Sequence, residues 1–430
     1  MNQAFTAIQW MIFMLAAAIV APIAIGELYG FEGIEKAAFV QRTMFVLGVA
    51  GILQGLIGHR YPINEGPAGL WWGIFLIYAG FAGTIYASTS EVLQYLQAGM
   101  LISGILFILL STFGFISALT SLFTPTVTFV YLLLLIIQLS GAFMNGMLGV
   151  NEDTGTVDGV IMVASTFLLL LTFYFSSHRI QWIQRYSVIL SLLIGWASFS
   201  LLGKSPTISS IESNWISFPG VFVWGLPKWD AGMIVTGIFL TLLLTTNLIA
   251  SIRVMEHVVG NNGISLEKRA RQGGFVSGIN QLIAGTFSAI GSVPISGAAG
   301  FVATTGIKRI TPFILGSGLV VIVSLLPHVM NVFASIPPAV GYTVTFAIFT
   351  KMLAMAFSEW KKESDLDKAY TIAGPALLAG IGVMFVPSTA FTQLPTVVVS
   401  VLNNGLILGT LIAIVVEQLY MINQKRKNSV

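Results

Sequence analysis

The chain has 430 residues, of which 56% are hydrophobic and 9% are charged, and its formal net charge is +3. A soluble domain carries roughly a quarter charged residues, so this composition excludes a soluble globular fold with a polar coat. Because the chain contains no cysteine, disulfides, thiolate metal sites and cysteine nucleophiles are excluded as well.

Apolar runs of about 20 residues recur along the chain, and a helix of that length crosses a hydrocarbon core of roughly 30 Å. The first run follows no basic segment and is too long for the hydrophobic region of a signal peptide, so we expect it to be retained. The sequence predicts one all-α integral membrane domain of about fourteen spans, at residues 7–27, 38–58, 62–83, 94–116, 124–147, 159–177, 187–203, 231–254, 273–290, 293–307, 310–331, 336–356, 370–387 and 396–420.

The basic residues predict the orientation of these spans. If the N-terminus is cytoplasmic, 16 of the 20 Lys and Arg residues fall in cytoplasmic loops or in the C-terminal tail, and the other four are Lys36, Arg42, Lys204 and Lys228. Basic residues concentrate on the cytoplasmic side of a membrane protein. We therefore expect a multi-pass protein of the cell (cytoplasmic) membrane with both termini in the cytoplasm, and the short loops favour a bacterial source.

Seven spans in each half is an odd number, so a duplicated second half inserts upside down relative to the first. Residues 61–69, Tyr-Pro-Ile-Asn-Glu-Gly-Pro-Ala-Gly, open the third span, and residues 293–300, Val-Pro-Ile-Ser-Gly-Ala-Ala-Gly, open the tenth. Both run from Pro-Ile-(Asn/Ser) into small residues that end in Ala-Gly. This similarity indicates two inverted seven-span repeats, and chance similarity of two Gly/Pro-rich stretches is the alternative.

These two broken segments are the predicted binding site. Gly and Pro free backbone N–H and C=O groups, and a membrane tolerates such groups only where protein or a water-filled cavity covers them. Paired broken segments at matching positions of two repeats point to a binding site at the midplane, faced by helix N-termini. The alternative is that Gly and Pro only permit close helix packing.

Glu65 lies inside the first broken segment, where a charge is costly and usually functional. Its carboxylate is a candidate for exchanging a coupling proton during transport. The alternative is that Glu65 lies near the cytoplasmic end and forms an ion pair with Arg60.

Asn247 lies in the middle of the eighth span, and Ser251 is on the same helix face one turn later. Such a face lines a polar site or forms hydrogen bonds between helices. In the same span Asp230 is a candidate N-cap, and in the last span Glu417 is expected at the membrane interface. Asn280 and Gln281 in the ninth span are weaker site candidates.

Several functions have no support in the sequence. The four histidines lack metal-ligand spacing, so no metal site and no cofactor are predicted. There is no P-loop and no Gly-x-Ser-x-Gly elbow, so an enzyme is not predicted. The topology accounts for the basic residues, so no nucleic-acid partner is predicted either.

Taken together, the sequence resembles the nucleobase–ascorbate transporter family, which includes the uracil and xanthine permeases. The resemblance covers nearly the whole chain. It rests on Gln9-Trp10 followed by Val20-Ala21-Pro22, on Pro62 with Gly66, on Ile336-Pro337-Pro338-Ala339-Val340-Gly341, and on Gly300, Thr305 and Gly306 of the tenth-span signature. The family signature has Glu or Gln where this chain has Gly297, Asn where it has Ala298, a glutamate where it has Asn247, and a histidine where it has Trp10.

The resemblance implies short extended stretches in the third and tenth spans that contact a base through main-chain atoms. These contacts map to Ala68 and Gly69 and to Ser296, Gly297 and Ala298. With Asn247 and Ser251 they form the candidate substrate site. Because both family carboxylates are missing, Glu65 is the candidate that replaces them.

The resemblance also implies a core domain of residues 1–118 and 228–333, a gate domain of residues 119–205 and 334–422, and often a homodimer. The implied activity is uptake of a nucleobase, of the purine or uracil/xanthine type, by alternating access. Coupling to H+, or alternatively to Na+, is implied with it. The competing hypotheses are an anion transporter of the sulfate/bicarbonate type with the same architecture, a non-transporting protein that retains the fold, and, with least support, a membrane enzyme.

Overall fold

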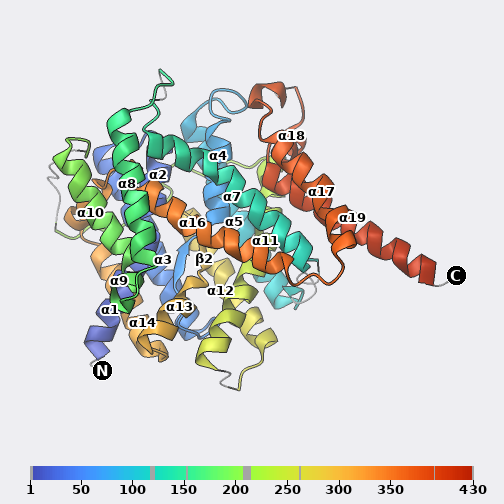
Figure 1. Cartoon of the computed structure of the whole chain (residues 1–430), viewed down its shortest axis with the longest axis horizontal. Coiled ribbons are helices and arrows are strands. Elements are labelled where there is room, and N and C mark those ends of the chain that lie inside the picture. Colours follow the sequence, from blue (N-terminus) through green and yellow to red (C-terminus); the bar gives the residue numbers. More distant parts are fainter. Residues whose placement is uncertain are drawn as a thin grey trace.

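The structure is a computed structural model that describes residues 3–116, 122–151, 154–206, 215–260, 263–391 and 393–428. These residues form a helical bundle with a short strand pair inside it (Figure 1). In chain order the elements are α1 (Gln3–Ala18), α2 (Val20–Leu28), α3 (Gly33–Leu56), β1 (Glu65–Pro67), α4 (Gly69–Ala79), α5 (Thr89–Thr112), α7 (Pro125–Leu148), α8 (Gly159–Ser176), α9 (Gln181–Arg185), α10 (Ser187–Leu201), α11 (Ala231–Val259), α12 (Leu266–Thr286), β2 (Ser292–Pro294), α13 (Gly297–Thr305), α14 (Ile310–Ser324), α15 (Pro327–Ala334), α16 (Pro338–Trp360), α17 (Leu366–Val383), a 3-10 turn (Ser388–Phe391), α18 (Thr396–Leu402) and α19 (Gly405–Asn428).

Within the described residues, eight helices are long and apolar enough to cross a membrane, with α1 and α2 counted as one. The number rises to nine if α14 and α15 form one broken span. Two shorter apolar helices, α4 and α10, add to them. The prediction of a mostly helical, multi-pass membrane protein is therefore confirmed.

The eleventh predicted span, residues 310–331, is not a straight helix. Its two parts, α14 and α15, meet at an angle of 89°. Pro327 is the first residue of α15, and proline cannot continue a helix because it has no N–H and its ring clashes with the preceding turn. Hydropathy alone does not report this bend.

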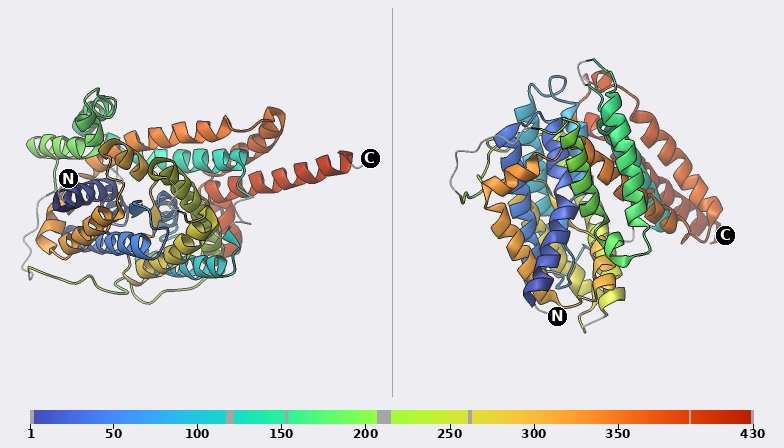
Figure 2. Two further views of the ribbon diagram at one scale, coloured as in Figure 1. Left: turned by 90° about the horizontal axis from the view of Figure 1, so that it is seen from below. Right: turned by 60° about the vertical axis from the view of Figure 1, so that its left-hand side comes forward.

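The helices pack in two groups. The first contains α1, α3, α5, α11, α12, α14 and α15, and the second contains α7, α8, α10, α16, α17 and α19. In the left view of Figure 2 the second group lies as a layer along one side of the first. α2 and α4 contact both groups, since α2 packs on α3 and α16 and α4 packs on α5 and α7.

Glycine permits the closest helix contact in each group. A Cβ atom on Gly278 of α12 would lie 2.7 Å from the carbonyl oxygen of Gly104 on α5. A Cβ atom on Gly405 of α19 would lie 2.2 Å from the carbonyl oxygen of Gly380 on α17. No side chain fits at these distances, so glycine is required where these backbones touch.

The two similar segments of the sequence meet in space. β1 and β2 pair antiparallel, with Glu65 opposite Pro294, Gly66 opposite Val293 and Pro67 opposite Ser292. Each strand leads into a short helix, α4 after β1 and α13 after β2. The pairing satisfies backbone groups that the Gly and Pro residues would otherwise leave bare inside a membrane.

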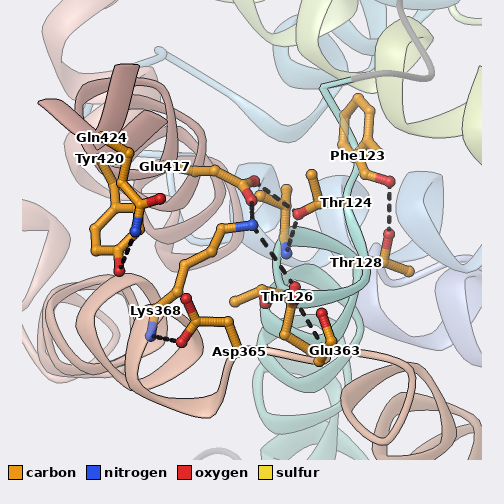
Figure 3. A network of polar contacts seen from close by, with 12 residues as sticks. Phe123, Thr124, Thr126, Thr128, Glu363, Asp365, Lys368, Glu417, Tyr420 and Gln424 are labelled. Atoms are coloured by element: carbon orange, nitrogen blue, oxygen red, sulfur yellow. Dashed lines mark hydrogen bonds and ion pairs between the residues drawn. The ribbon is translucent and has the colours of Figure 1, made fainter. Parts of the chain in front are cut away.

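One end of the second group is held by a partly buried polar network (Figure 3). The Thr124 hydroxyl donates to Glu417 at 2.6 Å, and the Thr126 hydroxyl donates to Glu363 at 2.9 Å. Lys368 lies between the two carboxylates, 2.7 Å from Glu417 and 3.8 Å from Glu363. Glu417 is fully buried among the helices, so its carboxylate is held by this network, and its position at the membrane interface stays a prediction.

Candidate functional site

The site is built on the last carbonyl of β2. Asn247 Nδ2 donates to Pro294 O at 3.0 Å, and Ser251 Oγ donates to the same oxygen at 2.9 Å. Both donors come from α11, which begins at an N-cap as predicted, since the Asp230 carboxylate accepts from Met233 N at 2.7 Å. The polar face of α11 therefore binds the strand pair directly.

The predicted site residues divide by exposure. Asn247, Gly69, Ser296 and Gly297 keep exposed surface, whereas Ala68, Ala298 and Ser251 are buried. The Ala68 N–H donates to Gly291 O at 2.9 Å, and the Ala298 N–H donates to Ile295 O at 3.1 Å. Gly297 is exposed and the other three of the first set are half-buried, so these four have surface to offer a ligand, and the three buried residues support them.

The start of α13 has room for a larger residue. A Cβ atom on Gly297 would have only the side chain of Ile295 within 4 Å, at 3.6 Å. Gly297 and Gly300 are both exposed on this helix, while Ala298 and Ala299 between them are buried. The first N–H groups of a helix have no partner within it and carry partial positive charge. The Ala298 and Ala299 N–H groups already donate to Ile295 O and Ser296 O, so this end of α13 can attract carbonyl groups of a ligand through its partial positive charge.

The start of α4 faces the second group of helices. A Cβ atom on Gly69 would lie 3.7 Å from Cζ of Phe349, which belongs to α16. Gly69 is half-buried and follows directly on β1. The site is thus bounded by residues of both helix groups.

Glu65 is buried on β1, and within the described residues neither carboxylate oxygen has a hydrogen-bond partner. No ion pair links it to Arg60, which is exposed. The alternative of a simple Glu65–Arg60 pair is not observed.

Behind the strand pair, β2 is held by Gln281 and Trp71, and the sequence analysis did not single out Trp71. Gln281 of α12 donates to Ser292 O at 2.7 Å, and Trp71 Nε1 of α4 donates to Gln281 Oε1 at 3.0 Å. Gln281 was among the weaker candidates, but nothing in the local sequence distinguishes Trp71 from an ordinary core residue. The pair ties β2 to α12 and α4.

Trp10, which stands in place of the family's first-span histidine, is a packing residue. It is fully buried, and its ring contacts Phe301 of α13 at 4.6 Å and Phe313 of α14 at 5.2 Å between centroids. Trp10 therefore fixes α1 against α13 next to the site.

The connection from α3 to β1 is anchored by a buried cation. Arg269 of α12 donates to His59 O at 2.7 Å, and its guanidinium lies 3.9 Å from the ring centroid of Tyr61. His59 Nδ1 accepts from Tyr61 N at 3.1 Å. Burial, and after it the nearby Arg269 charge, lowers the pKa of His59 to about 3. His59 is therefore a neutral structural residue at physiological pH.

This fold is that of known membrane transport proteins. The transmembrane domain of the cyanobacterial bicarbonate transporter BicA is similar, with a TM-score of 0.62 and 14% identity, over 96% of this chain and 98% of that domain. The anion transporter SLC26A9 is similar over 96% of this chain and 65% of its own, with a TM-score of 0.65 and 11% identity. At these identities the likeness shows the fold alone.

The sequence comparisons identify the family. Residues 1–389 match the model of the xanthine/uracil permease family, whose description is "Permease family". The Bacillus subtilis (strain 168) protein YwdJ, whose name assigns it provisionally as a purine permease, is 40% identical over 98% of this chain and 97% of its own length. The xanthine permease and the uric acid permease PucK of the same organism are 24% and 23% identical over 98% and 97% of this chain, and 94% and 95% of theirs. The chain belongs to the xanthine/uracil permease family, as its sequence motifs indicated.

Proposed function

We propose that this protein imports a nucleobase of the purine or uracil/xanthine type by alternating access. The observation that carries the proposal is the antiparallel pairing of β1 with β2 beneath the Asn247–Pro294 hydrogen bond. It brings two helix N-termini and the half-buried Asn247 amide together at one place, which suits a neutral heterocycle that needs both donors and acceptors. The names of the family relatives, purine, xanthine and uric acid permeases, support the same substrate class.

The proposed topology has fourteen spans in two inverted repeats. The described helices, with the broken pairs β1–α4, β2–α13, α14–α15 and α18–α19, support this number of spans. The division into two helix groups supports a core domain of residues 1–118 and 228–333 and a gate domain of residues 119–205 and 334–422. The positive-inside rule supports cytoplasmic termini.

The proposed substrate contacts are the half-buried residues Asn247, Gly69 and Ser296 and the exposed residue Gly297. Ser251, Ala68 and Ala298 are proposed to position them, since they are buried behind or beside the strand pair. Access from the cytoplasm is supported by the exposed residues Gly297, Gly300 and Ala303, which follow one side of α13 toward the basic loop that begins at Lys308.

Glu65 is the proposed proton acceptor for symport. A buried carboxylate without an ion-pair partner costs least when it is protonated, and Glu65 is the acidic residue of the strand pair. Glu65→Gln should leave base binding intact and remove the pH dependence of uptake. Uptake by Glu65→Gln that keeps the full pH dependence of the wild type would disprove this role. Na+ coupling is the alternative and predicts uptake that depends on Na+ at constant pH.

Two other functions compete with this one. The similar fold of BicA and SLC26A9 makes anion transport an alternative function. The two broken segments, residues 61–69 and 292–300, contain no Lys or Arg to hold an anion. Trp10, Asn247 and Gly297 differ from the residues of the family motifs, and this difference makes a non-transporting protein that retains the fold a second alternative. Homodimer formation is proposed on the family resemblance.

Uptake by purified protein in liposomes tests the proposal. Labelled xanthine, uric acid, uracil, sulfate and bicarbonate are offered with an inward proton gradient, and protein-free liposomes serve as the control. Accumulation of one base, competed by the unlabelled base, supports the permease. Uptake of an anion alone supports the anion transporter, and no uptake beside an active family member supports the non-transporting protein.

A further inference from the structure

A recess opens in the first helix group where α3 and α5 end and α12 begins. Its volume is about 540 Å³, and its lining comes from the residue after α3, from the last turn of α5 and from the first turns of α12. The lining carries two cationic side chains, Lys268 and Arg271, and no acidic one. None of its residues belongs to the candidate substrate site.

The recess lies at the cytoplasmic end of these helices in the proposed topology. The N-terminus and the start of α12 lie at the same, lower end of the bundle in Figure 1. The cytoplasmic leaflet of a membrane presents anionic lipid headgroups, and these attract basic side chains at the membrane surface. The recess is therefore placed where such headgroups lie.

The face of α12 that lines the recess changes from cationic to apolar along the helix. Lys268, Arg271 and Phe275 are spaced by three and then four residues, so they share one face. All three are exposed, and the phenyl ring follows the first cation by about 10 Å along the axis. Beside them Ile57, the residue after α3, keeps 50% of its surface exposed. This order matches a phospholipid, in which a phosphate at the surface is followed by acyl chains.

The two cations have capacity left for a ligand. Lys268 forms no ion pair within the described part of the chain. Arg271 donates from Nε to Ser111 O at 3.0 Å and from Nη2 to Thr112 O at 2.8 Å. These carbonyls lie in the last turn of α5, where no donor within the helix remains. The two bonds fix the guanidinium plane without using Nη1.

The walls of the recess are close-packed behind these side chains. A Cβ atom on Gly274 of α12 would lie 2.7 Å from Ser111 Oγ of α5, so glycine lets the two helices touch directly behind the cations. Gly278 makes the same kind of contact with Gly104 one turn further on. A site that is fixed before its ligand arrives loses little conformational entropy on binding.

From these observations we infer that the recess binds the headgroup phosphate of an anionic phospholipid from the cytoplasmic leaflet. Lys268 and Arg271 face the phosphate, and Phe275 and Ile57 face the first part of an acyl chain. A soluble phosphate ester would gain from the cations but not from the exposed apolar side chains, so a lipid is the occupant that uses the whole surface. The inference goes beyond the proposed function, since it does not depend on which substrate the protein carries.

The first test measures unfolding midpoints of the purified full-length protein in detergent. Phosphatidylglycerol, phosphatidylcholine or glycerol 3-phosphate is added in increasing amounts. We expect phosphatidylglycerol to raise the midpoint until the site is saturated, because a ligand of the folded state stabilises it. The other two should have little effect. An equal effect of phosphatidylcholine would show that the cations do not select the lipid, and an equal effect of glycerol 3-phosphate would show a site for free phosphate esters. Either result would overturn the inference.

The second test compares two lysine variants. Lys268→Gln removes one cation and should weaken the apparent affinity for phosphatidylglycerol about fivefold, which is the value of one lysine at an anionic surface. Lys361→Gln is the matched control, since Lys361 is an exposed lysine that follows α16 in the second helix group, outside the recess. It should bind the lipid as the wild type does. Both variants should unfold like the wild type without lipid, because both lysines are exposed.

Native mass spectrometry gives a second readout of the same comparison. The wild type and Lys361→Gln should retain one more phosphatidylglycerol molecule than Lys268→Gln at the same lipid concentration. Equal retention and affinity in the wild type and Lys268→Gln would overturn the inference. An equal loss in Lys361→Gln would overturn it too, because the lipid would then respond to the total charge of the cytoplasmic face and not to the recess.

Discussion

Lys368 Nζ lies 2.7 Å from a carboxylate oxygen of Glu417 and joins the start of α17 to the buried side of α19. Glu417 has no exposed surface, and Thr124 of the turn before α7 donates to its other oxygen at 2.6 Å. The Glu417 carboxylate is thus buried, while the Lys368 side chain keeps 18% of its surface exposed. The pair links the start of α17 to the middle of α19 beside the start of α7, and loss of Lys368 would leave a buried carboxylate without a counter-charge.

Removal of one partner should be far more harmful than removal of both. Lys368→Met leaves the Glu417 carboxylate buried without a cation, and a cost of about 3 kcal/mol in unfolding free energy is expected. The double variant Lys368→Met with Glu417→Leu should recover most of that loss. Unfolding midpoints in one detergent give the four corners of the double-mutant cycle. Strictly additive effects would show that the pair makes no joint contribution.

Stability should depend on pH through His59. Its pKa is lowered to about 3 in the folded protein, chiefly by burial, whereas an unfolded chain binds the proton near pH 6.5. Between about pH 3 and pH 6.5 the unfolded state therefore binds more protons than the folded state. Stability is complete above about pH 6.5 and falls, by at most about 1.4 kcal/mol per pH unit, as the pH drops toward 3.

His59→Asn tests this origin of the pH dependence. An asparagine oxygen can accept from Tyr61 N in place of His59 Nδ1, and asparagine does not titrate. The slope of the unfolding midpoint between pH 6 and pH 4 should become shallower in this variant. An unchanged slope would mean that other titratable groups cause the pH dependence of stability.

Gly291 and Gly297, which flank β2, should differ sharply in their tolerance of a side chain. Gly297→Gln is expected to fold like the wild type, since its Cβ meets only Ile295 at an ordinary distance, and to change which base binds by adding an amide at the site. A Cβ on Gly291, by contrast, would lie 2.4 Å from both Gln281 Oε1 and the Trp71 ring. Gly291→Ala should therefore destabilise the fold by about 1–3 kcal/mol.

Unfolding midpoints and a base-binding panel for the two glycine variants check this contrast. A stable Gly291→Ala protein with unchanged base binding would show that the Trp71–Gln281 pair does not position β2. A Gly297→Gln protein that unfolds early would show that the start of α13 has no free space.

The parts of the fold that a local pattern encodes could be predicted from the sequence. Long apolar runs indicated the helices, and the repeated Pro-Ile segments indicated which two breaks correspond, because Gly and Pro act on their own backbone. The cap at Asp230 was predictable for the same reason. The bend at Pro327 was missed because hydropathy averages over it.

The contacts between distant elements could not be predicted. Asn247 and Ser251 were correctly grouped by helix periodicity, but periodicity does not say that both donate to Pro294 O. Nor does it show that Ala68, Ala298 and Ser251 are buried while Gly69 and Gly297 keep exposed surface. The contact of Phe349 with Gly69 depends on how the two helix groups dock, and no single segment contains that information.

The most direct test of the central claim is thermal unfolding of the purified protein and of Asn247→Ala with xanthine, uric acid, uracil, sulfate and bicarbonate. A ligand that binds only the folded state raises the midpoint. We predict that one base raises the midpoint of the wild type, that the increase is lost or much reduced in Asn247→Ala, and that the two anions have no effect. No increase with any base beside a responsive family member, or an increase that Asn247→Ala retains in full, would contradict a base site at the paired strands.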